Sequence, residues 1–275
     1  MVFGGGIMAI NITGQHVYTE KPILREETMH SHDTYEIFCL LAGDADYCVE
    51  GNRYHLQSGD LVLLRKGEVH IFQLRSAAPY ERIFINFDIP EVLDFMDAGN
   101  LLSVFNDRPL GKFNHYQASL FPNNHWQEYL QTICRETDSR KQLCYLLPLL
   151  QDLTDRQDVV KTAPALSEKD RAAPIIKYIN NHLTDDLSLE MLSQRFYISK
   201  THLIRIFKRA TGTTVWEYIT IKRLFLAKEL IAAGKAPTDI YQQCGFKDYT
   251  TFFRAYKQRF GVSPKAHGLH KEILS

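Results

Sequence analysis

The sequence is poor in the features that mark secreted, membrane or disulfide-bonded proteins. It has only five cysteines in 275 residues and none of them forms a CxxC pair, which argues against a disulfide scaffold and favours a reducing compartment. Its first residues lack the charged start and apolar run of a secretion signal. No apolar stretch approaches the roughly 20 residues that a membrane helix needs. We therefore expect a cytoplasmic protein with no membrane partner.

Motifs of several enzyme classes are also absent. The sequence has no Walker-type or dinucleotide-binding glycine loop, no GxSxG nucleophile elbow and no HExxH zinc motif. We therefore assign no catalytic residues and do not expect an enzyme.

The chain has no net charge, with 32 basic and 32 acidic residues, but its two halves differ. Residues 170–275 contain 17 Lys and Arg against nine Asp and Glu, so their net charge is +8, whereas the preceding residues carry −8. Basic modules attract phosphate backbones. The asymmetry therefore indicates a nucleic-acid-binding module joined to an acidic one.

The first half alternates short apolar runs with turn signals. Glycine turns such as Ala42-Gly43-Asp44 and Ser58-Gly59-Asp60 separate runs that are rich in β-branched and aromatic residues. This spacing is typical of a β-sandwich or barrel. The expected strands include Tyr35–Leu41, Leu61–Leu64, His70–Leu74 and Arg82–Phe87.

Helical periodicity follows the predicted strands. Trp126–Thr137 and Lys141–Leu153 repeat their apolar residues by threes and fours, so we expect two helices there. Pro148 should kink or interrupt the second helix. These two helices are the candidate dimerisation segment.

A polar segment divides the chain into two domains. Residues 155–170 show no apolar periodicity, so we place the linker there. Residues 1–154 then form a sensor and dimerisation domain, and residues 171–275 form a helical domain. The six helices expected in it are Ile175–Leu183, Leu189–Phe196 after a Ser188 cap, a Ser199-capped helix to Ala210, Val215–Ala233, Pro237 to Gly245, and Asp248 to Gly261.

Two of these helices belong to an internal repeat with a spacing of 49 residues. Each copy has a capping residue, two apolar residues four positions apart, a basic outer face and a glycine stop. A short helix precedes each copy across a tight turn, which is the arrangement of a helix-turn-helix. The aligned pairs are Ser199 and Asp248, Leu203 and Phe252, Arg205 and Arg254, Phe207 and Tyr256, and Gly212 and Gly261.

The outer face of each repeated helix provides candidate DNA contacts. Arginine can donate two hydrogen bonds to guanine, and an apolar side chain can lie against a thymine methyl group. A plain helical bundle with solvated basic residues is the alternative, and the duplication within a basic module argues against it. The candidate DNA-binding residues are Lys200, Thr201, His202, Ile204, Arg205 and Arg209 in the first copy, and Tyr249, Thr250, Phe253, Arg254 and Lys257 in the second.

Residues 172–268 resemble the DNA-binding domain of the AraC family of bacterial transcription regulators. The similarity lies in LSLEMLSQRFYISKTHLIRIFKRATGTT, WEYITIKRLFLAKEL and CGFKDYTTFFRAYKQRFGVSPKAH. It implies two helix-turn-helix units, held by a central helix, that enter adjacent major-groove segments on one DNA face. Tyr241 departs from the family pattern, which favours a small residue there, and Ile204 stands where polar residues are common. The base readers implied by position are Thr201, Ile204 and Arg205, and Tyr249, Thr250, Phe253 and Arg254.

The first half also contains a histidine cluster. His30, His32 and Glu36 lie two and four positions apart, so on a strand their side chains share one face. His70 is expected to join them from a neighbouring strand. Three imidazoles and a carboxylate are a suitable ligand set for a divalent ion of iron, manganese, nickel or zinc. Alternatively, the four residues line a metal-free effector pocket or brace the sheet through hydrogen bonds.

Residues 25–87 resemble the two cupin motifs, and the four cluster residues occupy the positions that ligate metal in metal-binding cupins. Arg65 and Leu74 stand in place of the usual Pro and Asn of the second motif. Together the two resemblances imply an α+β multidomain protein. Its N-terminal part is a cupin-like β-barrel with a helical dimerisation segment, and its C-terminal part is an all-α double helix-turn-helix domain.

These features predict a sequence-specific DNA-binding transcription regulator that is controlled by a small-molecule effector in its first domain. Its expected partners are double-stranded operator or promoter DNA, an effector for which a sugar is a candidate, a second copy of the chain in a homodimer, and RNA polymerase as a further candidate. No cofactor is assigned apart from the divalent metal considered for the histidine cluster. The alternative function is a metal-dependent cupin enzyme that carries a DNA-binding module.

Overall fold

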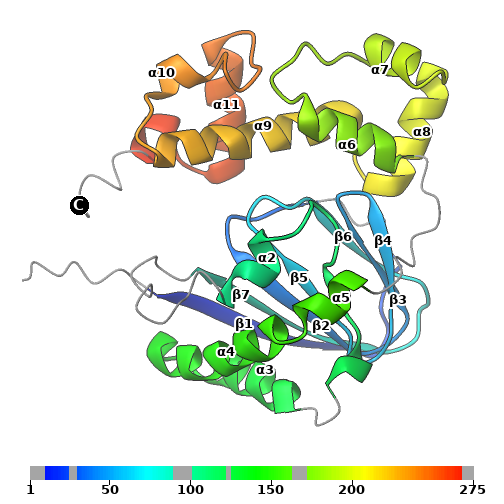
Figure 1. Ribbon diagram of the computed structural model, residues 1–275, viewed down its shortest axis with the longest axis vertical. Helices are drawn as coiled ribbons and strands as arrows, with labels where there is room; N and C mark the ends of the chain where they lie inside the picture. The colour runs from blue at the N-terminus through cyan, green and yellow to red at the C-terminus, as the bar shows by residue number, and fades with distance from the viewer. Residues whose placement is uncertain (1–9, 25–29, 89–100, 122–124, 163–171, 268–275) are drawn as a thin grey trace, which may run out of the picture. The chain divides into compact units, whose positions relative to one another are not determined.

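The computed structural model describes residues 10–24, 30–88, 101–121, 125–162 and 172–267. These residues form two compact units, divided between residues 170 and 171 (Figure 1). The first unit contains the strands and several helices, and the second is entirely helical where it is described. No helix in these ranges is both long and apolar enough to cross a membrane.

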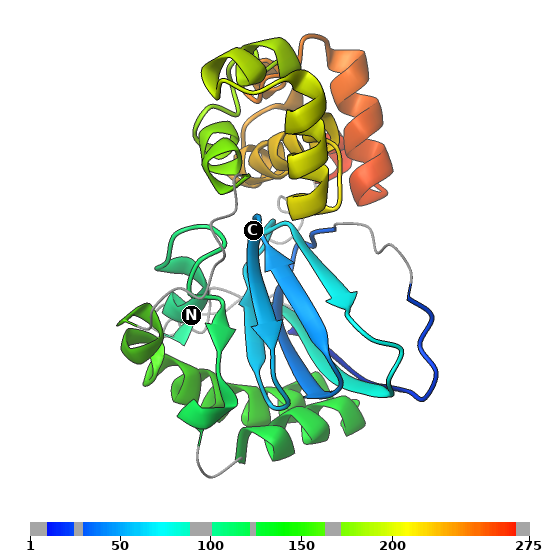
Figure 2. The same ribbon diagram turned by 90° about the vertical axis from the view of Figure 1, so that its right-hand side faces the viewer.

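The first unit is built on two antiparallel sheets (Figure 2). The five-stranded sheet has the order β1 (Asn11–Thr19), β7 (Tyr80–Asp88), β2 (Tyr35–Ala42), β5 (Leu61–Leu64) and β8 (His115–Tyr116). The three-stranded sheet has the order β4 (Asn52–Leu56), β3 (Ala45–Val49) and β6 (His70–Leu74). All four strands named from the sequence are present, with bounds shifted by at most two residues.

Successive strand residues point to opposite sides of the five-stranded sheet, and apolar residues contribute to a core on each of its faces. Its inner face packs against the three-stranded sheet, and Phe38 and Val62 lie there. Its outer face carries Ile37 and Ile85 and packs against helices. Figure 1 shows α3 and α4 lying together beside strand β1. The helices of this unit are α2 (Ser103–Asn106), the 3-10 turn η2 (Ala118–Leu120), α3 (His125–Arg135), α4 (Ser139–Thr154) and α5 (Gln157–Thr162).

Of the two architectures expected from the strand spacing, a sandwich or a barrel, the first unit has two facing sheets. Among the described residues, the two sheets share no strand pairing apart from a single bridge between His30 and His70. Each sheet buries an apolar face against the other, so packing face to face removes both apolar faces from water without the strands closing into a barrel.

Two helical expectations need correction. Helix α4 continues through Pro148 without interruption, although the proline removes one backbone hydrogen bond. Leu146, Leu149 and Leu150 are fully buried on either side of it, and this packing holds the helix together. The segment 155–170 is folded in its first half, where α5 lies and Val160 enters the outer-face core. Residues 163–170 lie outside the described residues.

The second unit follows the predicted helices closely. Helix α10 is shorter than expected and ends at Ile240, because the chain then forms hydrogen-bonded turns up to Gly245, whose φ is +82°. Figure 2 shows α8 and α11 packed against α9. The helices are α6 (Ala173–Asn181), α7 (Leu189–Arg195), α8 (Lys200–Thr211), α9 (Val215–Ala232), α10 (Pro237–Ile240) and α11 (Tyr249–Phe260).

Candidate functional site

Helices α8 and α11 begin and end with the same geometry. The Ser199 hydroxyl accepts a hydrogen bond from the His202 backbone N–H at 3.2 Å, and the Asp248 carboxylate accepts one from the Thr251 N–H at 2.7 Å. Each side chain thereby satisfies an N–H that the first helical turn leaves unpaired. At the other end, Gly212 and Gly261 adopt φ values of +73° and +74°, the left-handed conformation that stops a helix.

The apolar residues of the repeat are equivalent as well. Leu203 and Phe207 of α8 have no exposed surface, and neither have Phe252 and Tyr256 of α11. The ring of Phe207 meets Tyr218 of α9 edge-on at 5.5 Å, and the α11 pair packs into a core with α9 residues. Because the same face of each helix is buried against α9, the opposite face of each is left exposed.

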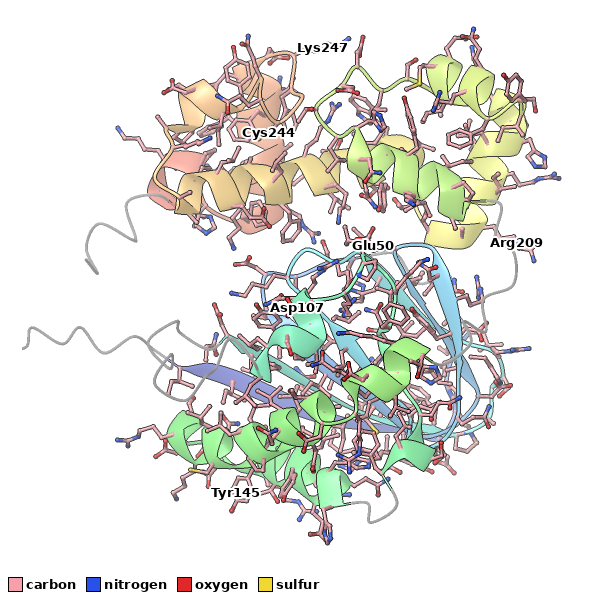
Figure 3. The ribbon with its side chains drawn as sticks, viewed as in Figure 1. Glu50, Asp107, Tyr145, Arg209, Cys244 and Lys247 are labelled. Carbon is pink, nitrogen blue, oxygen red and sulfur yellow. The ribbon has the colours of Figure 1, made fainter. Side chains whose placement is uncertain are left out.

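The exposed faces carry the residues that the sequence singled out. Three of the eleven candidates, His202, Tyr249 and Phe253, are half-buried. The remaining eight, all exposed, are Lys200, Thr201, Ile204, Arg205, Arg209, Thr250, Arg254 and Lys257. In Figure 3, Arg209 projects from the end of α8.

Contacts among these residues constrain some of them. Lys200 forms an ion pair with Glu190 of α7. The Arg205 guanidinium lies 3.2 Å from Nδ1 of His202, one turn earlier on the same face. Arg209 lies further along α8 than Lys200 and Arg205, away from the turn between α7 and α8.

The unusual Tyr241 is accommodated by an aromatic contact. Its ring meets Tyr249 edge-on at 5.8 Å, and Tyr249 in turn lies 5.8 Å from Phe252 of the α11 core. The large side chain thus packs against the beginning of α11 and half-buries Tyr249.

Sequence reasoning missed three residues of this unit. Tyr197, in the turn before α8, has a positive φ of 53° and a side chain that is 95% exposed. Lys247, in the loop before α11, points outward (Figure 3) and pairs with Asp186 at 3.5 Å. Their neighbouring turns were predictable, but the sequence gives no signal for the direction of either side chain.

The third missed residue, Arg223 of α9, connects the two copies of the repeat. Its guanidinium donates hydrogen bonds to the carbonyl oxygens of Leu183 and Asp185, in the loop before α7, at 2.8 Å each. It also donates to the carbonyl of Gly245, in the turn before α11, at 2.7 Å. A Cβ at Gly245 would lie 2.6 Å from the Arg223 guanidinium carbon, so only glycine fits this contact.

In the first unit, the histidine cluster forms where the sequence placed it. One nitrogen each of His32 and His70 and an oxygen of Glu36 lie within 4.8 Å of one another. His30 contributes differently: its backbone forms the bridge to His70, and its ring meets the His70 ring at 4.3 Å. His30 and His32 precede β2 rather than lying in a strand, so the expected alternation on one strand is wrong for these two.

Hydrogen bonds fix the orientation of each cluster residue. His32 points both ring nitrogens at oxygen acceptors, the Thr34 carbonyl and the Glu36 carboxylate, each at 2.9 Å. The Tyr47 hydroxyl donates to the other Glu36 oxygen at 3.1 Å. His70 donates its Nδ1–H to the Glu68 carbonyl at 2.8 Å, and its buried Nε2 has no hydrogen-bond partner among the residues with a described structure.

Burial controls the charge of this cluster. It lowers the pKa of His70 to about 3, so the ring is neutral at pH 7. Burial is the largest influence on Glu36 and opposes its ionisation, but the hydrogen bonds from His32 and Tyr47 and the electrostatic attraction of His70 and His32 together outweigh it, so the pKa of Glu36 lies below its usual value. The cluster therefore combines a carboxylate with a neutral imidazole whose free nitrogen can accept a proton donor or a metal ion.

A buried ion pair holds the turn before His70 in place. Both carboxylate oxygens of Glu68 contact the Arg108 guanidinium, at 2.7 and 2.8 Å, and neither side chain is more than 1% exposed. Arg108 also donates to the carbonyl of Leu63 in β5. The geometry of His70 thus depends on a residue nearly 40 positions later in the chain.

Two family models match the chain. The AraC-like ligand binding domain matches residues 23–119, and a helix-turn-helix domain matches residues 192–267. The probable transcriptional regulator LumQ from Photobacterium leiognathi is 25% identical over 244 residues, which cover 87% of this chain and 91% of LumQ. The lactose operon transcription activator from Staphylococcus xylosus is 20% identical over 240 residues, with coverages of 84% and 82%. Among solved structures, fatty-acid-bound ToxT from Vibrio cholerae is similar with a TM-score of 0.40 and 14% identity, over 96% of this chain and 97% of ToxT.

Proposed function

We infer that the chain belongs to the AraC family of transcription regulators, since it carries an AraC-like ligand binding domain followed by a helix-turn-helix domain. We propose that α8 and α11 read an operator and that a small molecule bound to the first unit controls this binding. The observation that carries this proposal is the equivalence of α8 and α11. Each has a side-chain cap and a glycine stop, a buried apolar pair four residues apart, and an exposed arginine at the equivalent position.

In this proposal the exposed residues of the two helices divide the work of binding. Arg205 and Arg254 reach base edges, because an arginine can donate two parallel hydrogen bonds to guanine. Lys200, Arg209 and Lys257 neutralise phosphates and fix the position of the domain without reading sequence. Ile204 is exposed and apolar, which suits a thymine methyl group.

The first unit is the sensor in this proposal, and its helices form the contact with a second copy. Tyr145 projects from α4 (Figure 3), and about a third of its surface is exposed. An aromatic side chain in that position is common at the centre of protein interfaces. RNA polymerase is a further candidate partner of the DNA-bound protein.

Selection of bound sequences from random double-stranded DNA tests the proposal. The expected result is a two-part site whose halves lie about one helical turn apart. Affinity for this site should fall linearly on a log–log plot against salt concentration, with a slope of about −0.9 for each neutralised phosphate. Binding that shows no preferred sequence, or a preferred site read by one half alone, would contradict the proposal.

A metal-dependent cupin enzyme is the second candidate, and the unpartnered Nε2 of His70 is the observation that favours it. His32, Glu36 and His70 would hold the ion, which would supply Lewis-acid chemistry when bound. His32 would first have to give up the hydrogen bond between its Nε2 and Glu36.

Elemental analysis of the purified full-length protein separates the two candidates. Under the regulator proposal we expect metal well below one ion per chain, and His70→Ala should leave DNA affinity within about twofold, a difference of less than 0.5 kcal/mol. One ion per chain that is lost in His70→Ala, together with turnover of a substrate, would favour the enzyme. Glu68→Gln is a control for damage to the turn that positions His70.

A further inference from the structure

Arg82 lies on the inner face of the five-stranded sheet, and none of the residues that the structure describes forms an ion pair with it. It lies at an even position of β7, between inner-face neighbours Tyr80 and Phe84, and it is only half-buried. Its guanidinium carbon lies 5.0 Å from the ring centre of Phe72, 5.7 Å from Tyr80 and 5.6 Å from Phe84. Its Nε is buried and has no hydrogen-bond partner among the described residues.

The neighbours of Arg82 in the described part of the chain offer it no carboxylate. Its cross-strand neighbours are Val17 of β1 and Leu40 of β2. Glu81, the next residue back, points to the other face of the sheet and pairs with His16 there. The inner-face carboxylate of Glu36 is already bound by His32 and Tyr47.

An arginine in this position is costly unless something binds it. Taking a guanidinium N–H out of water without an acceptor has an energetic penalty, and contact with aromatic faces returns only part of it. The planar fork of donors on arginine matches the two oxygens of a carboxylate. The missing partner is therefore an anion with that geometry.

The space next to Arg82 is open to solvent on one side. On the same face of β1, Val17 lies opposite Arg82 and is half-buried, and Gln15 and Thr13 further along the strand are exposed. By contrast, Phe38 and Leu40 of β2 and Val62 and Leu64 of β5 are buried under the three-stranded sheet. A molecule can therefore approach Arg82 from the β1 side and lie against the rings of Phe72, Tyr80 and Phe84.

We propose that Arg82 binds the carboxylate of a small organic acid whose apolar part lies against these three rings. The site rests on the proposed function of the first unit as the sensor, and it names the chemical class of the effector. Thr13 and Gln15 supply hydrogen-bonding groups at the edge of the site. A neutral sugar, the effector considered from the sequence, would leave the guanidinium without its counter-ion.

Calorimetric titration and thermal unfolding of the full-length protein test the site. The probes are phenylacetate and octanoate at millimolar concentration, each paired with its neutral amide, and glucose as a neutral sugar. We expect at least one acid to bind and to raise the melting temperature, and its amide and glucose to do neither. In Arg82→Met the affinity for the acid should fall at least tenfold, whereas Arg82→Lys should retain part of it. Arg135→Gln, at an exposed arginine of α3, should bind like the unchanged protein.

The unliganded variant separates binding from a structural role. If Arg82 serves a ligand, Arg82→Met without ligand should unfold at the same temperature or higher, because an unpaired cation is replaced by an apolar chain of similar length. An Arg82→Met variant that melts lower and binds the acid as well as the unchanged protein would overturn the proposal. So would binding of glucose or an amide in preference to both acids, or no binding by either acid. DNA binding is measured on the same samples. If the protein binds DNA but neither acid binds to it, the site at Arg82 is wrong and the regulator function stands. If the unchanged protein does not bind DNA, the proposed function itself is refuted.

Discussion

Arg205 and Arg254 occupy equivalent positions in the two repeated helices, and both are exposed. They differ in their neighbours, since Arg205 lies against His202 whereas Thr251, the corresponding residue of α11, bonds Asp248. His202 thus restricts the rotamers of Arg205 before DNA binds. An arginine that is partly ordered loses less conformational freedom when it contacts a base.

Substitution of each arginine by alanine tests these roles separately. Arg205→Ala and Arg254→Ala should each weaken binding by about 1–3 kcal/mol and relax the preference at one base position. The two positions should lie in different halves of the site. Sequence selection with each variant measures this, with Lys235→Ala as the control because Lys235 is exposed outside both helices. Unchanged base preference in both variants would refute the assignment.

Single residues were predictable from the sequence where a repeat or a spacing fixed them. The caps Ser199 and Asp248 followed from the 49-residue repeat, and the histidine cluster followed from its spacing. Arg82 and Arg223 did not, because their significance depends on what lies opposite them in space. For Arg82 the sequence offered one signal, which is an arginine at an inward position of a strand with alternating residues.

Helices α8 and α11 are built alike, but their caps respond differently to pH. Hydrogen bonds from the backbone and side chain of Thr251 hold the pKa of Asp248 below its usual value of 3.8. A carboxylate with a depressed pKa stabilises the folded state above its unfolded pKa, and this contribution disappears as pH falls through the folded value. The Ser199 hydroxyl does not titrate in this pH range, so the stability that it contributes to α8 does not depend on pH there.

The two caps therefore provide a matched pair of variants. Ser199→Ala should cost about 1 kcal/mol at every pH at which the protein folds. Asp248→Ala should also destabilise at neutral pH, but its difference from the unchanged protein should shrink as pH falls below 3.8. Denaturant unfolding at several pH values measures both. A constant difference for Asp248→Ala would show that the carboxylate charge does not contribute.

Elements were predictable where local signals and packing agree. The strands and five of the six helices of the second unit followed from apolar periodicity, with glycine and capping residues at their ends. Pro148 is the opposite case: the local signal favours a break, and burial of Leu146, Leu149 and Leu150 against the sheet overrides it. A sandwich or barrel was predictable from the spacing of the strands, but the order in which the strands pair was not, because pairing between distant segments leaves no local pattern.

At the scale of the whole chain, the charge separation matches the division into two units. The basic surplus lies in residues 170–275 and the acidic surplus in the remainder. Within the basic unit, Arg223 is the residue that ties both copies of the repeat to α9. Its three carbonyl partners come from the loops that precede α7 and α11.

Removal of this connection should loosen the spacing between the two DNA-reading helices. Arg223→Met leaves three carbonyl groups without a donor, so we expect a loss of roughly 1–3 kcal/mol in stability. Affinity for the two-part site should fall, while tolerance for one extra base pair between its halves should increase. Binding to sites of altered spacing measures the effect.

Lys247→Met is the matched control for Arg223→Met. Lys247 and Asp186 join the same two loops, but both side chains are about 80% exposed, and such surface pairs contribute little. Equal effects of the two variants would contradict the role assigned to Arg223.

Strand β7 is shared by both cores of the first unit. Arg82 and Phe84 face the three-stranded sheet, whereas Ile83 and Ile85 face the helices. On that side the fit is close: a Cβ at Gly14 would lie 2.9 Å from both Ile85 and Cys134 of α3. We therefore expect a molecule that shifts this strand from one face to displace α3 at the other, because closely packed interiors transmit such shifts.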